Sequence, residues 1–206
     1  MQPDDSYWHD FYESGRAPTF SSQFAVFAQS WIQGQRALIY EFGAGNGRDA
    51  RFFHEMGHVV KASDQVLGTQ LKDLAAEAPR LSLIEGDVTA TSALQVPDAP
   101  GNPELIVVYS RFFQHAIPED VEDKMLANLR ASLPPGALCF FEFRIDEDEA
   151  LPKTFDNHYR RYQSPQSFIE RVSATGMELR YSVTGSGFAN YRVEDPIVGR
   201  FVFEQV

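Results

Sequence analysis

The chain has 206 residues and a formal net charge of −11 at pH 7. Domains hold roughly 100–200 residues, so we expect one domain over residues 1–206 with a single core. A chain this acidic is repelled by a phosphate backbone or an anionic bilayer unless its bases cluster, and we expect neither nucleic acid nor a membrane as a partner. The hydrophobic share of 43% is typical of a packed protein and argues against disorder.

Cysteine content and the N-terminal residues bear on compartment and metal binding. Cys139 is the only cysteine, which excludes an intrachain disulfide and a cysteine-cluster metal site. Residues 1–10 lack the basic and apolar regions of a signal peptide, and no apolar run approaches the roughly 18 residues of a membrane span. We therefore expect a cytoplasmic protein. The acidic residues 146–149 predict a solvated loop, because no spaced ligand pattern surrounds them, and no metal is expected.

The first half of the chain alternates helix and strand patterns. Residues 21–31 place apolar side chains at helical spacing, with Ser21 or Ser22 available as a cap. Residues 7–20, before this helix, are aromatic and polar. The patterns that follow predict a strand over 37–42, a helix over 49–56, a strand over 58–63, a helix over 67–78 and a strand over 81–85.

The second half continues the alternation. Residues 104–109 are a nearly continuous apolar run, as expected for a central strand buried on both faces. Pro118 is predicted at the first position of a helix whose apolar stripe ends at Leu133. A strand over 137–144, a helix over 165–175 and strands over 177–184 and 198–205 follow. This order predicts an α/β sheet that closes with an antiparallel hairpin at one edge.

A glycine-rich loop, EFGAGNG at residues 41–47, joins the first strand to the next helix. Glycines are needed where a Cβ would block a tight turn and the approach of a ligand to backbone N–H groups. A dinucleotide fingerprint has the spacing G-x-G-x-x-G, whereas here the third glycine comes one residue early. An NAD-type oxidoreductase is therefore the weaker reading of this loop.

The loop resembles the first motif of the class I S-adenosylmethionine-dependent methyltransferases. Asp64 at the end of the second strand and Gly86-Asp87-Val88 after the third match further positions of that family. The resemblance implies a Rossmann-like fold with a seven-stranded, mostly parallel sheet, an antiparallel last strand and helices on both faces. Residues 36–206 would form this core and residues 1–35 an N-terminal cover. S-adenosylmethionine is the implied cofactor.

The resemblance also implies which residues hold the cofactor. The glycine loop would pack on its methionine and ribose portion, Asp64 would accept the ribose hydroxyls, and Asp87 would face the adenine amine. As alternatives, Asp64 could cap a helix and Asp87 a turn. The full expected set is Glu41, Gly43, Gly45, Gly47, Asp64, Gln65, Asp87, Val88 and Tyr109.

The block from Tyr109 to His115 follows the central strand, where open α/β sheets bind ligands. His115, titrating near neutrality, is the candidate general base, or alternatively a structural histidine. Arg111 either pairs with an acidic side chain or clamps an anionic substrate group. The motif typical of DNA amino-methyltransferases, Asn or Asp followed by Pro-Pro-aromatic, is missing after this strand, which argues further against a nucleic-acid acceptor.

Three short blocks resemble a narrower methyltransferase branch of bacterial polysaccharide and small-molecule pathways: aromatics near the start, residues 109–115, and residues 158–162 with 194–196. Tyr7, Trp8, Phe11 and Tyr12 would fold over the cofactor and exclude water, or pack on the sheet. Tyr7, Trp8 and Tyr12 are also expected to contact the substrate. Arg160 and Arg161 would bind an anionic acceptor group or pair with the acids of 146–149 and 194–195. We expect methyl transfer to a small polar acceptor, such as a sugar or sugar-phosphate hydroxyl; the alternative is a catalytically silent cofactor-binding module.

Overall fold

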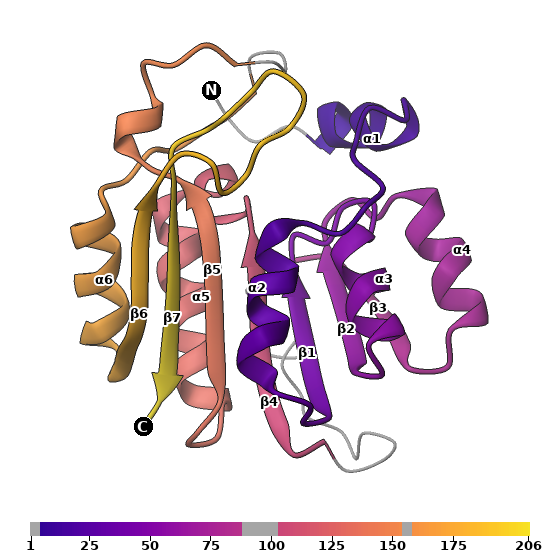
Figure 1. The fold of residues 1–206 in the computed structure, drawn as a ribbon, viewed down its shortest axis with the longest axis horizontal. Coiled ribbons are helices and arrows are strands. Elements are labelled where there is room, and N and C mark those ends of the chain that lie inside the picture. The colour runs from indigo at the N-terminus through magenta and orange to yellow at the C-terminus, as the bar shows by residue number, and fades with distance from the viewer. Residues whose placement is uncertain (1–4, 88–102, 154–157) are drawn as a thin grey trace.

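In the computed structural model, which describes residues 5–87, 103–153 and 158–206, one sheet has the strand order β3-β2-β1-β4-β5-β7-β6 (Figure 1). Its strands are β1 (Ala37–Phe42), β2 (Val59–Asp64), β3 (Leu81–Glu85), β4 (Leu105–Arg111), β5 (Leu138–Arg144), β6 (Met177–Gly185) and β7 (Val198–Gln205). The first five pair in parallel, and β7 runs antiparallel to both neighbours. The predicted mostly parallel sheet, its central β4 and its antiparallel last strand are confirmed.

Helices cover both faces of the sheet, as expected (Figure 1). They are α1 (Asp5–Glu13), α2 (Gln23–Ile32), α3 (Arg48–Glu55), α4 (Thr69–Glu77), α5 (Glu119–Ser132) and α6 (Pro165–Ala174), with short 3₁₀ turns η2 (Gln114–Ala116) and η3 (Asp146–Asp148). Successive side chains of β1 alternate between the faces. Leu38 and Tyr40 belong to the core under α5 and α6, whereas Ala37 and Ile39 belong to the core under α2, α3 and α4.

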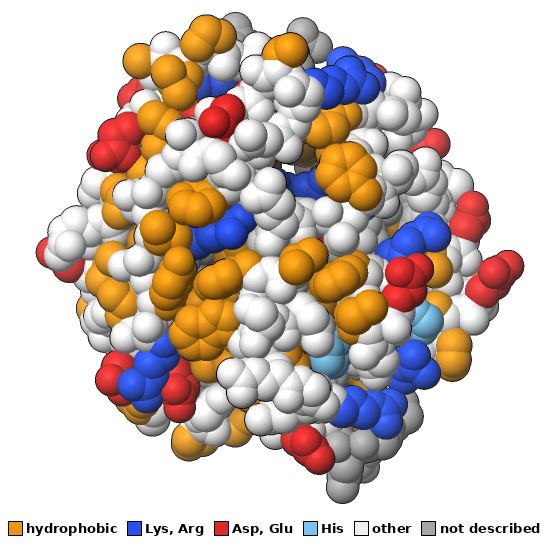
Figure 2. Space-filling model, viewed as in Figure 1, with side chains coloured by type: hydrophobic (Ala, Val, Ile, Leu, Met, Phe, Trp, Pro, Cys, Tyr) orange, Lys and Arg blue, Asp and Glu red, His pale blue; other side chains and the backbone are white. Residues whose placement is uncertain are grey.

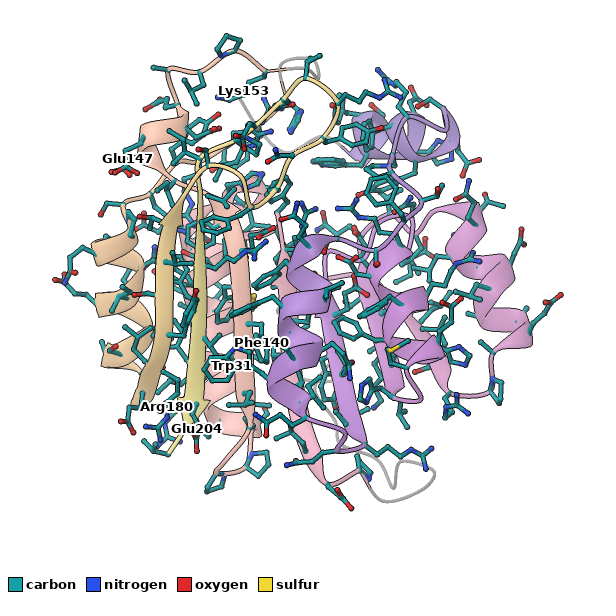
Figure 3. All side chains as sticks on the ribbon, in the orientation of Figure 1. Trp31, Phe140, Glu147, Lys153, Arg180 and Glu204 are labelled. Atoms are coloured by element: carbon teal, nitrogen blue, oxygen red, sulfur yellow. The ribbon has the colours of Figure 1, made fainter. Side chains whose placement is uncertain are left out.

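Aromatic side chains extend the cover of α2 toward the β5-β7-β6 side of the sheet. Trp31 of α2 lies against Phe140 of β5, with ring centroids 6.2 Å apart (Figure 3), and its ring also meets Tyr181 of β6. Hydrophobic side chains accordingly gather in the middle of the view in Figure 2, while Lys and Arg are scattered over that face. Further along, Arg180 and Glu204 form a cross-strand ion pair at 2.8 Å (Figure 3).

Three local predictions differ from the structure. A helix, α1, begins at Asp5, where the sequence indicated only an aromatic and polar segment. Pro118 is the N-cap of α5 and not its first helical residue, because its ψ of 156° is extended. Asp148, predicted to lie in a solvated loop, is fully buried and pairs with Arg144 at 2.8 Å and Lys153 at 3.0 Å. A buried arginine requires such a partner.

The carboxyl ends of the parallel strands meet at one edge of the sheet. The chain proceeds from β1 to β2 on one side and returns to β4 on the other side of β1. Such a reversal opens a crevice beyond the strand ends, where α/β proteins bind ligands. Helix α1 and the loop between β6 and β7 lie over this edge (Figure 1), and the candidate site is found there.

Candidate functional site

A pocket of about 460 Å³ lies at this edge, within the size range of small-molecule sites. The predicted site residues that line it are Tyr7, Trp8, Tyr12, Glu41, Gly43, Gly45, Asp64, Gln65, Asp87, Arg111, His115 and Arg160. Gly47, Tyr109 and Arg161 are not part of its lining. Val88 lies outside the described residues. The fold thus brings most of the predicted residues, from both ends of the chain, to one cavity.

The glycine loop lies so close to its neighbours that added side chains would collide with them. Gly43 and Gly45 have φ of +76° and +55°, in the left-handed region that favours glycine. A Cβ at Gly43 would lie 2.9 Å from Phe113, and one at Gly45 would lie 2.7 Å from the Tyr12 hydroxyl oxygen. Gly47 serves packing instead, because a Cβ there would meet Leu71 of α4 at 2.4 Å. The first two glycines therefore face the pocket, and the third lets α4 approach.

Asp64, at the end of β2, holds the glycine loop in place through hydrogen bonds. One carboxylate oxygen accepts the Gly45 N–H at 2.8 Å, and the other accepts the Val66 N–H at 3.1 Å. These two bonds hold the carboxylate in the pocket lining. Gln65 follows it in the pocket wall, and the exposed Asp87 lines the same wall after β3.

Glu41, the last but one residue of β1, is a buried carboxyl with an unsatisfied oxygen. It is 4% exposed, and its Oε2 has no hydrogen-bond partner in the described part of the chain. Burial, and next the negative Asp49, raise its pKa well above the ordinary value, while Arg48 opposes the shift. A buried acceptor with no partner is costly, and a cationic N–H donor from a ligand would satisfy it.

Arg48 was missed by the sequence reasoning. It is the first residue of α3, where the positive end of the helix dipole disfavours a cation. Burial and the nearby Arg111 lower its pKa. Its ion pair with Asp49 is long, with 4.0 Å between Arg48 Nε and Asp49 Oδ1. A basic residue in the first turn after a glycine loop was the available signal. Glu41 and Arg48 thus place a carboxyl group and a guanidinium group near each other in the pocket lining.

Tyr109 has a structural role in this arrangement. It lies inside β4, fully buried, because that strand continues to Arg111. Its hydroxyl donates to Asp49 Oδ2 at 2.8 Å, and the Ser22 hydroxyl donates to the same oxygen at 2.8 Å. Ser22 also caps α2 by accepting the Ala25 N–H at 3.0 Å. The predicted cofactor contact of Tyr109 is therefore replaced by a network that joins β4, α3 and α2.

His115, in η2, differs from the predicted base. Its Nδ1 accepts the backbone N–H of Arg144 at 3.3 Å, so a neutral ring carries its hydrogen on Nε2. Burial, then Arg144 and Arg160, hold its pKa well below the ordinary value of 6.5. The expectation that His115 titrates near neutrality is wrong, because these cations disfavour a charged ring. In this tautomer Nε2 donates a hydrogen bond and does not accept a proton.

Arg111 pairs with an acidic side chain, one of its two expected roles. Its Nε donates to Glu142 Oε1 at 2.8 Å, and Arg200 Nε donates to the other Glu142 oxygen at 2.5 Å. The Arg111 guanidinium also lies 4.1 Å from the Phe112 ring centroid. Phe112 has a φ of +57°, a conformation that costs a bulky residue roughly 1–2 kcal/mol. Its ring is thus held in the pocket wall by its neighbours.

The two adjacent arginines separate. Arg161 Nη2 donates to Glu122 Oε2 at 2.7 Å and to the Gln114 carbonyl at 3.2 Å. Its partner is an α5 carboxylate, not the acids around 146–149 or 194–195, and this pair turns it away from the acceptor position predicted for it. Arg160 lines the pocket and is half-buried.

Helix α1 is held over the pocket by contacts of its last residue and of the segment that follows it. The Glu13 carboxylate accepts the Thr69 hydroxyl at 2.8 Å at the start of α4, and the Tyr191 hydroxyl donates to the Arg16 carbonyl at 2.7 Å. Tyr7 stacks on His158 with centroids 4.6 Å apart. These contacts place the N-terminal aromatics above the cavity, as a cover would be.

Comparisons with known proteins agree with this geometry at the level of the fold. No protein-family model matches the chain, and no curated protein matches it in sequence. Among solved structures, a Burkholderia thailandensis 1,6-didemethyltoxoflavin-N1-methyltransferase is 18% identical with a TM-score of 0.72, covering 98% of this chain and 87% of its own. The CcbJ methyltransferase from Streptomyces caelestis is 14% identical (TM-score 0.67; 98% and 99% covered). The chain has the class I methyltransferase fold.

A third similar structure, a TehB-like SAM-dependent methyltransferase from Corynebacterium glutamicum, is 17% identical, with a TM-score of 0.62; the match covers 98% of this chain and 95% of that chain.

Within the described ranges, no group of His, Cys, Asp and Glu is arranged to hold a metal ion, and no helix is long and apolar enough to cross a membrane. Cys139 is buried, which raises its thiol pKa to about 12.

Proposed function

We propose that the protein transfers a methyl group from S-adenosylmethionine to a small-molecule acceptor. The observation that carries this proposal is the buried Oε2 of Glu41, which has no hydrogen-bond partner among the described residues and lies beside the glycine loop in the pocket lining. The cofactor carries an α-ammonium group that supplies the missing donor. The similar Burkholderia enzyme was crystallised with 1,6-didemethyltoxoflavin and S-adenosylhomocysteine, which supports a small-molecule acceptor in this fold.

Different residues of the pocket bind different parts of the cofactor. Glu41 accepts from its ammonium group and Arg48 faces its carboxylate, since these two side chains lie near each other. Asp64 accepts from ribose hydroxyls, Gly43 and Gly45 leave space for the chain of the cofactor, and Asp87 takes the adenine amine. The bound cofactor supplies a methyl group on a sulfonium centre, and the protein's part is to align a nucleophile with it.

The acceptor binds beyond the glycine loop, among Arg111, His115 and the aromatic residues of α1. A sugar or sugar-phosphate hydroxyl was the expected acceptor, and the arginine side chains that line the pocket suit a phosphate. A hydroxyl must lose its proton during transfer, however, and Nε2–H of His115 gives no base for it. An amine nitrogen or an already ionised oxygen fits His115 better. The polysaccharide setting is supported by the short sequence blocks alone.

Cofactor binding tests the first part of the proposal. Thermal unfolding with S-adenosylhomocysteine should show stabilisation, because a ligand that binds only the folded state raises its stability. Glu41→Gln should weaken this binding, whereas Glu204→Gln, at the other end of the sheet, should not. Stabilisation by NADH and not by S-adenosylhomocysteine would instead favour an oxidoreductase.

Turnover tests the second part. Formation of S-adenosylhomocysteine from S-adenosylmethionine should be measured with separate panels of amines, phenols, carboxylic acids and sugar phosphates. Acceptor-dependent turnover with one panel is the expected result. If the cofactor binds and every panel leaves it unconverted, the silent binding module would replace the enzyme as the better account.

A further inference from the structure

Cationic side chains concentrate at the acceptor end of the pocket of this acidic chain. Three arginines, Arg111, Arg144 and Arg160, line it together with the neutral His115. Two of them have built-in partners: Arg111 pairs with Glu142 at 2.8 Å, and Arg144 pairs with Asp148 at 2.8 Å and with Glu194. Arg160 makes no ion pair or hydrogen bond with the residues that the structure describes. Among the residues that the structure describes, no anion therefore forms an ion pair with this positive charge.

The surroundings of Arg160 disfavour its charge. Burial, and next the positive Arg144, lower its pKa, while Tyr162, Tyr7 and Glu194 offset this only partly. A half-buried guanidinium retains its proton in proteins. The free-energy cost of partly burying this charge therefore remains until an anion binds beside it. An anionic group of a ligand beside Arg160 would relieve both the desolvation and the repulsion from Arg144.

Two histidines of the chain show why the Nε2–H of His115 belongs to the same subsite. His58 and His115 each accept a backbone N–H through Nδ1, at 3.1 Å from Ala37 and 3.3 Å from Arg144. The Nε2–H of His58 then donates to Gln29 Oε1 at 2.8 Å. That of His115, by contrast, has no hydrogen-bond partner in residues 5–87, 103–153 and 158–206, and its ring lines the pocket. It is an N–H donor of a pocket-lining side chain, which a ligand can satisfy.

Flat aromatic surfaces flank these donors. The Phe112 ring contacts His115 with centroids 5.3 Å apart and lies 5.5 Å from the Arg144 guanidinium carbon. Also in the lining, Tyr7 and Trp8 of α1 meet His158 with ring centroids 4.6 and 4.9 Å apart. Aromatic walls with a few convergent polar groups are typical of sites for planar ligands.

We propose, on the basis of the proposed function, that the methyl acceptor is a planar small molecule with an anionic oxygen group, a carboxylate or a phosphate, that binds between Arg160 and Nε2–H of His115. Arg48 lies beside Glu41, and we assign it to the cofactor's own carboxylate. The anionic group would orient the acceptor, and the cofactor end would present the methyl group to it.

The test uses the full-length chain saturated with S-adenosylhomocysteine and three probes: benzoate, phenyl phosphate and the neutral benzamide. Isothermal titration should show binding of at least one anion and much weaker binding of benzamide. Arg160→Gln should weaken anion binding about tenfold or more, the equivalent of about 1.4 kcal/mol. Arg180→Gln, which removes an exposed arginine at the far end of the sheet, should change nothing. Benzoate against phenyl phosphate identifies which anion the subsite prefers.

Two variants of His115 separate its donor from its structural role. His115→Asn keeps an acceptor near the Nδ1 position and removes the Nε2–H, whereas His115→Gln keeps an N–H donor near the Nε2 position. Anion affinity should fall in the first and be largely retained in the second. Equal binding of benzoate by wild type and Arg160→Gln, or no anion binding at millimolar concentration, would overturn the inference.

The outcomes also separate this inference from the proposed function. If S-adenosylhomocysteine itself does not bind, the proposed function fails. If it binds with wild-type affinity to Arg160→Gln and the anions do not discriminate, only the acceptor inference fails. If Arg160→Gln weakens S-adenosylhomocysteine as much as the anions, Arg160 serves the cofactor carboxylate and the inference is wrong.

Discussion

The hydroxyl of Tyr12 lies directly over the backbone of Gly45: a Cβ on that glycine would come within 2.7 Å of the Tyr12 oxygen. Tyr12 belongs to the cover formed by α1, and Gly45 to the loop after β1. Burial, then the negative Asp64, raise the pKa of Tyr12 well above its ordinary value, so the phenol stays protonated. The cover and the cofactor loop are thus in contact through one glycine.

Gly45→Ala should lower stability and cofactor affinity together. Its φ of +55° costs a residue with a Cβ roughly 1–2 kcal/mol, and the methyl group would push Tyr12 off the loop. Gly136→Ala is the matched control, because its φ is +85° and nothing lies within 4 Å of its Cβ position. Urea unfolding should show a loss for both variants, whereas titration with S-adenosylhomocysteine should show weaker binding for Gly45→Ala only. Unchanged binding in both would mean that the Tyr12 contact is irrelevant to the cofactor.

Glu41→Gln should stabilise the protein at neutral pH while weakening S-adenosylhomocysteine binding. The pKa of Glu41 is raised in the folded state, so this group stabilises the fold at low pH, and that contribution is lost as pH rises through the folded pKa. Replacing a buried carboxyl group, whose ionisation the fold disfavours, by a neutral amide should gain roughly 1–3 kcal/mol. The measurement is urea unfolding at pH 7 for wild type, Glu41→Gln and Glu204→Gln. A destabilised Glu41→Gln would show that the carboxylate has a structural partner.

Much of the sheet could be predicted from the sequence because its signals are local. The apolar run of β4 and the glycines after β1 each mark an element without reference to the rest of the chain. Helix α1 was not predicted, because its aromatic residues line the pocket and do not form the apolar stripe by which a helix that packs on a core is recognised. Asp148 was misjudged for a similar reason: its partner Arg144 lies on β5, and burial of an acid depends on such tertiary pairing.

The candidate site divides in the same way. Glu41, Gly43, Gly45 and Asp64 follow strand ends, and their place in the pocket could be predicted from strand order alone. The roles of Tyr109 and His115 could not, because they depend on partners 60 and 29 residues away, Asp49 and Arg144. Spacing in the sequence indicates which edge a side chain lies near, and not which atom it contacts.

Protein stability should fall as pH is lowered below about 6.5, the ordinary histidine pKa, partly because of His115. Its folded pKa is depressed, by burial first and then by Arg144, so below pH 6.5 the unfolded chain binds more protons than the folded one. His58 acts in the same direction and Glu41 in the opposite one. Comparing wild type with His115→Asn cancels both.

The free energy of unfolding, measured by urea at a series of pH values, should therefore decline more steeply toward acid for wild type than for His115→Asn. The difference should open just below pH 6.5 and stop growing once the folded ring is also protonated. Parallel curves would mean that His115 titrates alike in both states, contrary to its burial among cations.

Tyr109→Phe should destabilise the fold and leave the cofactor affinity nearly unchanged. The substitution removes a buried hydrogen bond to the Asp49 carboxylate at 2.8 Å, and such bonds to charged groups contribute about 1.5–3 kcal/mol. Tyr181→Phe is the control, because that half-buried tyrosine makes ring contacts but no hydrogen bond to a described residue. Urea unfolding measures the loss, and titration with S-adenosylhomocysteine measures the affinity. A large loss of affinity in Tyr109→Phe, at temperatures where the variant is folded, would restore Tyr109 as a cofactor contact. We expect no such loss, because the hydrogen bonds to Asp49 affect the cofactor only through the positions of α2 and α3.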